Sequence, residues 1–505
     1  MRQDEAIVDT RPVRAIRVNA ADTVAVTLSD LEKGENIDVT GRSIRIAEPI
    51  PAFHKFALEP VAVGDCVIRF GQPIGEATRA ISVGQHVHSH NLKTRLSGTL
   101  DYVYEQIPVP AMQAAPDATF RGYRRADGRV GTRNEIWVIA TVGCVANVCD
   151  QIVRRSERQL DDEVDGVVAI THPFGCSQLG DDLVGTRDIL AGLARHPNAG
   201  GIVLVALGCE SNQVDDLLAA SGHIDRSRVR IVRSQAEADE IEAGVEAVME
   251  LVETASADRR ETCDLSDLVI GLKCGGSDAL SGLTANPLLG RVTDDVTAVG
   301  GSAVLTEIPE VFGAEHLLMA RAANEDVFRR TVDLVNGFKD YFLDHRQSVF
   351  ENPSPGNKAG GITTLEEKSL GAVQKAGSAT LTDVIRYGER VRKSGLTLLE
   401  APGNDAVSCT ALAAAGCNLI LFTTGRGTPL GFPVPTVKVA SNSGLAARKP
   451  GWIDFNAGQL IDGTDADATK KRFLQELATI ASGKQAGNEL NGERSIAIWK
   501  RGVTL

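Results

Sequence analysis

The stretch Leu268-Val269-Ile270-Gly271-Leu272-Lys273-Cys274-Gly275-Gly276-Ser277-Asp278 decides the fold, because an apolar run ends abruptly in glycine, cysteine and polar side chains. Three earlier apolar runs also end in a segment that contains a glycine followed directly by a cysteine. In open α/β sheets the ligand crevice lies outside the carboxyl ends of the strands, so we expect these ends to converge on one pocket. The alternative is that glycine closes an ordinary turn and cysteine is a small buried hydrophobe. The three earlier junctions span Val138–Cys144, Val167–Cys176 and Ile202–Cys209.

From about residue 120 onward, runs rich in Val, Ile and Leu alternate with amphipathic segments, as expected for strands that are covered on both faces. This pattern predicts an α/β fold with mainly parallel sheets. Residues 1–105 instead hold short apolar runs between glycine-containing turns, which predicts a small β-rich domain. We expect a linker at 106–119, an α/β domain at 120–260 and a C-terminal α/β domain at 261–505. The strands predicted in the α/β part are 135–142, 166–171, 201–207, 229–232, 268–272, 303–305, 396–400 and 419–422.

Composition limits the class of protein. The 505 residues carry a net charge of −13, which disfavours a nucleic-acid partner. No apolar run is long enough to span a bilayer and the N-terminus lacks a secretory signal pattern, so we expect a soluble cytoplasmic protein without a membrane partner. Nine cysteines are too sparse for a disulfide scaffold. No nucleotide cofactor is expected because dinucleotide and phosphate-loop motifs are missing. A homo-oligomer, taken as a dimer, is the usual state of such enzymes.

A histidine cluster stands out at His86, His88 and His90, which hold three of the nine histidines of the chain. If this segment is a strand, residues two apart share a face, so all three imidazoles point one way. Imidazole suits iron, zinc or manganese, and a neutral histidine can also act as a general base. The alternative is an exposed histidine-rich loop.

Two glycine-containing loops carry groups that suit anion binding. The segment 351–361 contains two prolines and three glycines, which fix an irregular backbone around Asn357 and Lys358. In the segment 422–428, Arg426 lies between two glycines and can form a bidentate pair with a carboxylate. Plain surface turns are the alternative for both segments.

Taken together, these motifs resemble the altronate and galactarate dehydratases, and the matches run in order over nearly the whole chain. The resemblance implies a SAF-type β domain at residues 15–95, followed by two α/β units. It also implies a divalent metal, most often iron(II), and dehydration of an aldonate or aldarate to a 2-keto-3-deoxy acid. The matching segments are 131–134, 207–213, 272–278, 282–287, 307–310, 313–315, 352–361 and 423–427.

Dehydration next to a carboxylate needs a base for the α-proton, stabilisation of the enediolate and an acid for the leaving hydroxyl. We expect His88 or His90 to act as the acid/base. Lys273 is expected in a catalytic role at the substrate carboxylate, together with Lys358. The other side chains expected to bind substrate are Arg133, Asn134, Asn212, Gln213, Ser277, Asp278, Asn286, Asn357 and Arg426.

Two arrangements for the metal follow from the residue types. One is mononuclear iron held by nitrogen and oxygen ligands, drawn from His86, His88, Glu307 and Glu310. The other uses Cys144, Cys176 and Cys209 as thiolates, which can extend to an iron–sulfur cluster with one open site. Two alternative functions remain at this stage: a lyase that expels sulfite from sulfolactate, and a non-catalytic sugar-acid sensor.

Overall fold

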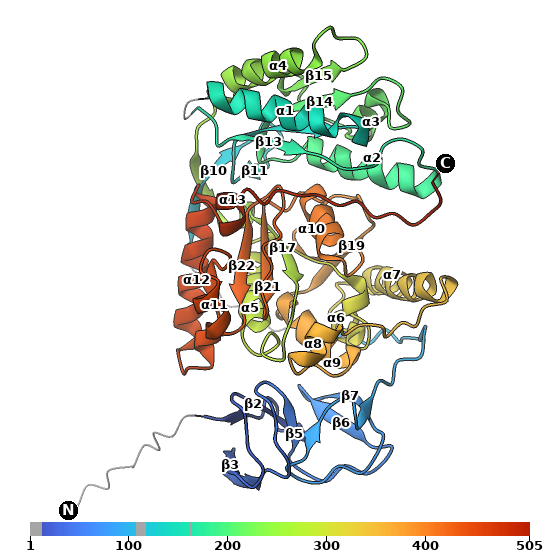
Figure 1. Cartoon of the computed structure of the whole chain (residues 1–505), viewed down its shortest axis with the longest axis vertical. Coiled ribbons are helices and arrows are strands. Elements are labelled where there is room, and N and C mark those ends of the chain that lie inside the picture. Colours follow the sequence, from blue (N-terminus) through green and yellow to red (C-terminus); the bar gives the residue numbers. More distant parts are fainter. Residues whose placement is uncertain (1–12, 108–117, 161–162, 505) are drawn as a thin grey trace, which may run out of the picture.

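The structure is a computed structural model that describes residues 13–107, 118–160 and 163–504. The N-terminal β-rich part lies at one end of the molecule, the first α/β domain at the other end, and the C-terminal α/β domain between them (Figure 1). The predicted linker at 106–119 falls mostly outside the described residues. Within them, none of the helices combines the length and hydropathy needed to cross a membrane.

The N-terminal domain consists of short antiparallel strands, as the sequence predicts. Its largest sheet has the order β1-β2-β5-β8, and two smaller sheets have the orders β3-β4 and β6-β7-β9. Alternate residues of β3 are buried, which is the pattern of a strand with one wet face. The strands are β1 (Ala15–Ile16), β2 (Val24–Thr27), β3 (Asn36–Val39), β4 (Arg42–Arg45), β5 (Lys55–Ala57), β6 (Cys66–Arg69), β7 (Gln72–Ala77), β8 (His86–Val87) and β9 (Leu92–Lys93).

The predicted histidine strand is shorter than expected. Strand β8 ends at Val87, because the side chain of Asn91 accepts from the His88 amide at 2.9 Å and donates to the His86 carbonyl at 2.8 Å. These two bonds satisfy backbone groups locally and turn the chain. The expectation that one strand face carries all three imidazoles is therefore wrong, although the rings still gather.

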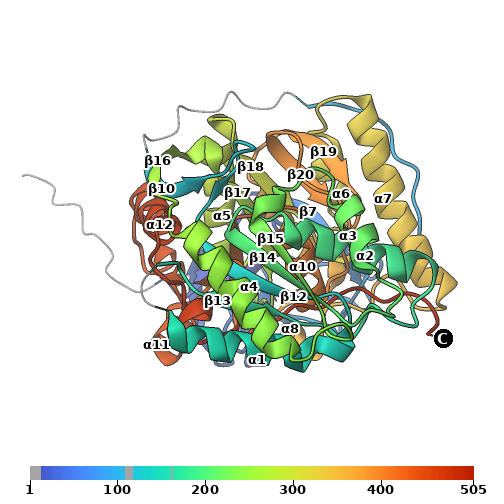
Figure 2. The ribbon, with the colours of Figure 1, turned by 90° about the horizontal axis from the view of Figure 1, so that it is seen from above.

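The first α/β domain has a four-stranded parallel sheet in the order β13-β12-β14-β15. Helices α1 and α4 cover one face, and α2 and α3 cover the other, where α2 also packs on α10 of the next domain (Figure 2). The side chain of Asp239 caps α4 by accepting from two backbone amides. The elements are β12 (Glu135–Ala140), α1 (Ala146–Ser156), β13 (Val167–Ile170), α2 (Gly180–Ala194), β14 (Ala199–Ala206), α3 (Val214–Ala220), β15 (Val229–Arg233) and α4 (Glu240–Ala255).

The C-terminal domain is built on a seven-stranded parallel sheet in the order β19-β20-β18-β17-β21-β22-β23. Helix α5 packs on one face and α10 on the other. All eight strands predicted in the α/β part are present, which confirms the α/β assignment. The strands are β17 (Val269–Cys274), β18 (Ser302–Leu305), β19 (Leu381–Ile385), β20 (Gly395–Leu399), β21 (Leu419–Thr424), β22 (Thr436–Ala440) and β23 (Phe455–Asn456). The helices are α5 (Ala285–Ala298), α6 (Glu315–Met319), α7 (Glu325–Asp344), α8 (Pro355–Ala359), α9 (Leu365–Ala372), α10 (Asp405–Ala414), α11 (Ser443–Arg448), α12 (Ala466–Ala481) and α13 (Gly487–Leu490).

A small antiparallel sheet joins the two α/β domains. Its order is β11-β10-β16, with β10 (Thr119–Arg124), β11 (Val130–Gly131) and β16 (Glu261–Asp264). The predicted boundary between residues 260 and 261 therefore lies at the start of β16, within this connection. The C-terminal segment also returns to the first α/β domain, where Asp182 accepts from the Arg501 amide at 2.7 Å.

The N-terminal domain docks on the C-terminal domain through a buried carboxylate. Glu367 of α9 lies between Lys55, whose Nζ is 2.9 Å from a carboxylate oxygen, and Arg69. Burial alone would raise the pKa of the Glu367 carboxyl, but the two cations outweigh it and bring that pKa to about 2. Lys55 also donates to the Gly361 carbonyl at 2.7 Å, so the ion pair sits in a hydrogen-bonded frame.

We expect Glu367→Gln to destabilise the protein by about 3–5 kcal/mol, because two buried cations lose their anion. Glu35→Gln, which breaks the half-exposed pair with Arg14, is the matched control and should cost less than about 1 kcal/mol. Because the folded-state pKa of Glu367 is depressed, its contribution is present above about pH 4.5 and is lost as the pH falls toward 2. Calorimetric unfolding over this pH range tests both points. Equal losses of stability in the two variants would contradict the first, and a contribution of Glu367 that does not change between pH 4.5 and 2 would contradict the second.

Candidate active site

The carboxyl edge of the seven-stranded sheet contains a topological switch point between β17 and β21. From β17 the chain continues to β18 on one side, whereas β21 leads to β22 on the other. A crevice forms where neighbouring strands depart in opposite directions. The segments after the two strands are joined there, since the Gly275 amide donates to Thr423 at 3.0 Å and the Arg426 amide donates to Gly276 at 3.0 Å.

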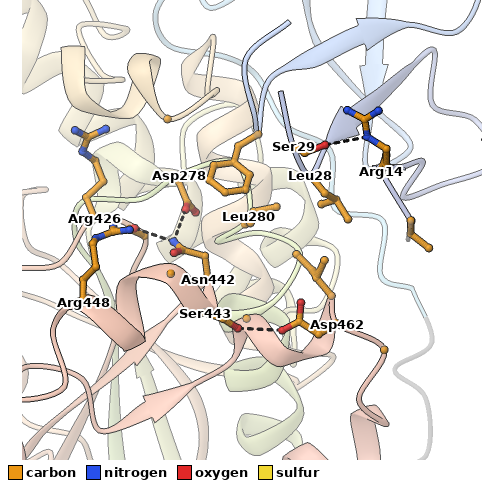
Figure 3. A pocket seen from close by; sticks show the side chains of 18 of the residues that line it. Arg14, Leu28, Ser29, Asp278, Leu280, Arg426, Asn442, Ser443, Arg448 and Asp462 are labelled. Carbon is orange, nitrogen blue, oxygen red and sulfur yellow. Dashed lines mark hydrogen bonds between the residues drawn. The ribbon is translucent and has the colours of Figure 1, made fainter. Parts of the chain in front are cut away.

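A cavity of about 960 Å³ opens beside this switch point, between the N-terminal and C-terminal domains. Figure 3 shows Asp278, Asn442 and Arg426 on the C-terminal side and Arg14 and Ser29 across from them. A volume of this size accommodates a small polar metabolite. Both domains contribute walls, so the N-terminal domain is part of the cavity.

The polar groups of this interdomain cavity are held in place by hydrogen bonds. Asp278 accepts from Asn442 at 3.1 Å, from Ser441 at 2.8 Å and from Ser281 at 2.9 Å. Burial nevertheless raises the pKa of its carboxyl. Gly425 passes so close that an added Cβ would lie 2.3 Å from the Asp278 carboxyl carbon, so only glycine fits there.

Two arginines of the cavity have charged side chains that are available to a ligand. Arg426 and Arg448 both line it and are exposed, and Figure 3 draws both on the side of the C-terminal domain. Arg426 makes a long contact to the Gly356 carbonyl at 3.4 Å, which does not neutralise a guanidinium. Guanidinium groups bind carboxylates bidentately, so this pair suits an acidic substrate.

Four imidazoles gather on the face of the N-terminal domain that meets α9. The Nδ1 of His54 lies 3.0 Å from the Nε2 of His86, and His86 and His88 stack with ring centroids 5.4 Å apart. The His90 ring centroid is 5.2 Å from that of His86. One ring nitrogen from each of His54, His86 and His88 lies within 4.8 Å of the others, which is the spacing of ligands around one ion. We call these three residues the imidazole trio.

The imidazole trio is held in the neutral form that binds metals. Burial and the neighbouring rings lower the pKa of His86 to about 3, and burial with Lys55 lowers that of His88 to about 4. Burial also lowers the pKa of His54, against the effect of a hydrogen bond to the Ala359 backbone. Backbone and hydroxyl partners of this kind orient metal-binding histidines, and Thr363 lies 3.2 Å from the His88 ring.

A second, mostly buried cluster lies at the carboxyl ends of β17 and β18. Lys273 forms ion pairs with Glu307 and, at 2.9 Å, with Asp405. Lys375 lies 2.9 Å from the Cys274 sulfur and 3.3 Å from Glu307. Burial would lower the pKa of Lys273, but Glu307 and Asp405 hold it well above its usual value, so this lysine stays charged.

The same cluster extends to α9 and the loop before α8. Lys368 binds Glu310 at 2.7 Å and Asn352 at 3.0 Å. Burial would raise the pKa of Glu310, but Lys368 and Lys273 outweigh it and lower that pKa. A second cavity, of about 510 Å³, opens onto Cys274, Glu310 and Lys368.

The two groups fit a metal ion unequally. Cys274, Glu307 and Glu310 also have ligand atoms within 4.8 Å of one another, but three lysine ammonium groups already neutralise the carboxylates of their cluster. A divalent cation there would face three ammonium groups. Among the described residues the imidazole trio forms no ion pair with a carboxylate, and it offers three neutral nitrogen donors, so it fits a divalent metal better.

Strained backbone marks both groups. Phe53, which precedes His54 and lines the interdomain cavity, has φ of 71°. Glu307 has φ of 65°. Left-handed conformations of residues other than glycine cost roughly 1–3 kcal/mol and tend to occur at functional sites. The surrounding contacts therefore hold His54 and Glu307 in place against this cost.

The structure brings several sequence-predicted residues together at the switch point. Asn357 donates to the Ser277 carbonyl at 2.9 Å, beside Asp278 and Arg426. Lys358 is exposed on α8. Of the residues proposed to bind substrate, these five surround the two cavities or lie directly beside them.

Other predicted substrate ligands hold the fold together. Arg133 pairs with Glu489 at 2.7 Å. Asn134 donates to the Ala255 carbonyl at 2.9 Å, and Asn286 joins the Gly371 carbonyl to Thr423. All three residues are buried in these contacts, so we do not place them at the substrate.

The predicted single pocket divides into two. Cys144, Cys176 and Cys209 follow strands of the first α/β domain, together with Asn212 and Gln213, whereas Cys274 follows β17 of the other sheet. The expectation of one convergent pocket is therefore wrong, because the four strand ends belong to two separate sheets. Gln213 donates to the Glu210 carbonyl at 2.6 Å within its own loop.

Sequence reasoning missed some residues of the site. His54 lies 32 positions before His86 and joins it only through pairing of β5 with β8. Arg448 and Asn442 stand in ordinary helical and loop contexts that give no signal. Cys274 lies inside a segment already singled out, and Lys368 follows Glu366 and Glu367 in a charged run that could have indicated an ion-pair cluster.

The fold and site define an enzyme in which a small β domain docks over the switch point of an α/β sheet. Three family descriptions match: altronate/galactarate dehydratase SAF domain over residues 13–95, D-galactarate dehydratase/altronate hydrolase second domain over 122–256, and D-galactarate/altronate dehydratase C-terminal over 265–504. The chain belongs to the galactarate/altronate dehydratase family.

Curated relatives agree with this assignment. Altronate dehydratase of Bacillus subtilis is 49% identical over 97% of this chain and 99% of its own length. Galactarate dehydratase (L-threo-forming) of Escherichia coli is 34% identical over 93% of both chains. The (2R)-sulfolactate sulfo-lyase subunit beta of Chromohalobacter salexigens is a more distant relative, 30% identical over 75% of this chain and 97% of its own.

The thiols of the chain should differ sharply in reactivity. Cys144, Cys176 and Cys209 are exposed, whereas Cys149 and Cys274 are buried. Burial and Glu307 raise the pKa of the Cys274 thiol to about 11, so it should remain a protonated, unreactive group. Brief alkylation of the metal-free native protein followed by peptide mass spectrometry should label only the exposed set. Labelling of Cys274 as fast as Cys144 would contradict this picture.

Proposed function

We propose that this chain is a hydro-lyase that removes water from an altronate-like aldonate, with a galactarate-like aldarate as the next candidate substrate. The observation that carries the proposal is the interdomain cavity at the β17/β21 switch point. It is lined by Arg426 and Arg448 and by Asp278 and Asn442, which can bind hydroxyl groups, and it lies beside the imidazole trio. The product is a 2-keto-3-deoxy acid. Family membership supports the reaction class, and the arginines support an anionic substrate.

Substrate binding follows from the charges of the interdomain cavity. Arg426 and Arg448 hold the carboxylate, because both line the cavity and neither forms an ion pair with a described residue. Asp278 and Asn442 are fixed by mutual hydrogen bonding and present groups that recognise hydroxyls. Lys273 remains a charged, buried residue of the neighbouring ionic cluster and keeps Glu307 in position.

Proton transfer is assigned to the imidazole outside the trio. His54, His86 and His88 would hold a divalent metal, which we take to be iron(II). When bound, such an ion supplies Lewis-acid stabilisation of charge on the substrate. His90 is exposed next to His86, so it can accept the α-proton on a ring nitrogen and return it to the departing β-hydroxyl. Two residues that line the cavity lie next to the imidazole trio. Phe53 directly precedes His54, and the backbone of Ala359 forms a hydrogen bond with the His54 ring.

Two other functions remain as alternatives. A sulfo-lyase acting on sulfolactate would share the elimination chemistry and need a cationic site for the sulfonate, and Arg14 across the cavity already pairs with Glu35. A non-catalytic sugar-acid sensor would bind without turnover. The full set of acid/base and cationic groups favours the hydro-lyase.

A substrate panel tests the proposed function. Metal-loaded enzyme is incubated anaerobically with altronate, galactarate, other aldonates and sulfolactate, and 2-keto acid, sulfite and residual substrate are measured. We expect 2-keto-3-deoxy acid from altronate with the highest kcat/KM. Sulfite release from sulfolactate without dehydration of any sugar acid would overturn the proposal, as would thermal stabilisation by altronate without product.

The histidine roles separate in two variants. His86→Ala should lose bound metal and activity together, because it removes a nitrogen donor of the trio. His90→Ala should keep the metal and lower kcat by about 10²–10⁴-fold, as expected for a lost general acid/base. His223→Ala, in the first α/β domain, is the control and should leave metal content and kcat unchanged. Metal loss in His90→Ala, or full activity in either site variant, would refute this assignment.

A further inference from the structure

The first α/β domain has a switch point of its own that the proposed function does not use. From β12 the chain continues to β13 on one side, whereas β14 leads to β15 on the other. The loops that follow β12, β13 and β14 therefore lie at the carboxyl edge of this sheet, the position where α/β sheets bind ligands. This domain lies at the opposite end of the molecule from the N-terminal domain and its imidazole trio (Figure 1).

Each of these three loops presents an exposed cysteine: Cys144, Cys176 and Cys209. Cysteine is among the most buried residue types, and an exposed thiol is normally avoided on a surface. Of the six other cysteines, five are buried and Cys66 is partly exposed. The exposed thiols thus coincide with the strand ends at one switch point.

Hydrogen bonds lock the three loops against one another. The Gly143 amide donates to the Phe174 carbonyl at 2.7 Å, and the Asn212 amide donates to the Gly175 carbonyl at 2.9 Å. Glu210 accepts from Thr141 at 2.7 Å, which ties the end of β12 to the end of β14. The sulfur-bearing loops are therefore a connected, built structure.

Left-handed backbone conformations flank Cys176 on both sides. Gly175 has φ of 96°, and an added Cβ would lie 2.3 Å from the Thr141 carbonyl oxygen. Ser177, on the other side of Cys176, also adopts a positive φ, of 56°. Strain of this kind at a residue other than glycine is typical of functional loops.

A buried acceptor beside these loops also lacks a partner. The Oδ1 atom of the fully buried Asn212 has no hydrogen-bond partner among the described residues. An unpaired buried acceptor is costly, so it marks a place where a donor or a bound group would be stabilised.

We propose that Cys144, Cys176 and Cys209 ligate an iron–sulfur cluster of the [4Fe–4S] type, with one iron left open to solvent or to an oxygen ligand. Three soft thiolates select iron–sulfur chemistry over hard cations. Within the described residues these sulfurs do not form a group with all ligand atoms within 4.8 Å of one another, which disfavours a single tetrahedral ion as the occupant.

Cluster binding balances without oxidation of the protein. Each of the three thiols loses its proton to solvent and forms one bond from Sγ to iron. Ferrous iron, ferric iron and sulfide supply the cluster atoms. The site is separate from the imidazole trio, so it stands or falls independently of the metal and the substrate assigned under the proposed function.

Anaerobic reconstitution of the full chain with ferrous and ferric salts and sulfide tests the proposal. After desalting, we expect on the order of four iron and four acid-labile sulfide per chain, with the Mössbauer signature of a cubane cluster. Cys144→Ser, Cys176→Ser and Cys209→Ser should each lower bound sulfide by at least about tenfold. Cys66→Ser is the matched control at the partly exposed cysteine and should retain the cluster, as should His86→Ala.

Several outcomes would overturn the cluster. These are iron without labile sulfide, zinc as the bound species, a disulfide between two of the three cysteines under reconstitution conditions, or sulfide retention in the three serine variants equal to that of Cys66→Ser. Circular dichroism and melting temperature establish that each variant is folded, so that loss of sulfide reports on ligation. Retained sulfide in His86→Ala together with lost activity would support two separate metal sites.

Discussion

The positions of the candidate sites depend on pairs of adjacent parallel strands whose following connections leave in opposite directions. Helices that return on opposite faces of a sheet cannot close the space above the two central strand ends, so loops and side chains from elsewhere must line it. The chain contains two such places, one after β17 and β21 and one after β12 and β14. The N-terminal domain covers the first, and exposed thiols border the second.

Docking of the N-terminal domain and order in the ionic cluster are linked through helix α9. Glu367 faces Lys55 and Arg69 of the N-terminal domain, while the next residue, Lys368, faces Glu310. Adjacent residues of one helix thus serve two charged networks. Because both are buried, a shift of α9 that improves one network would leave charges in the other unpaired.

The sequence alone predicts the α/β fold well, because long Val, Ile and Leu runs such as residues 201–207 have few other uses. It also predicts that glycine and cysteine at strand ends mark sites. It fails where pairing between distant segments decides the outcome: His54 reaches His86 only through β5 and β8, and Arg133 reaches Glu489 only in the folded chain. A local side-chain bond from Asn91 ended the histidine strand, which periodicity could not reveal.

The two-sided interdomain cavity has an evolutionary consequence. Arg14, Leu28 and Ser29 form one wall on a small β domain, whereas the arginines and Asp278 belong to the sheet that carries the other wall. Substrate length and stereochemistry can therefore drift through exchanges in fewer than a hundred N-terminal residues while the sheet stays unchanged. The two walls of the cavity can thus change independently of each other.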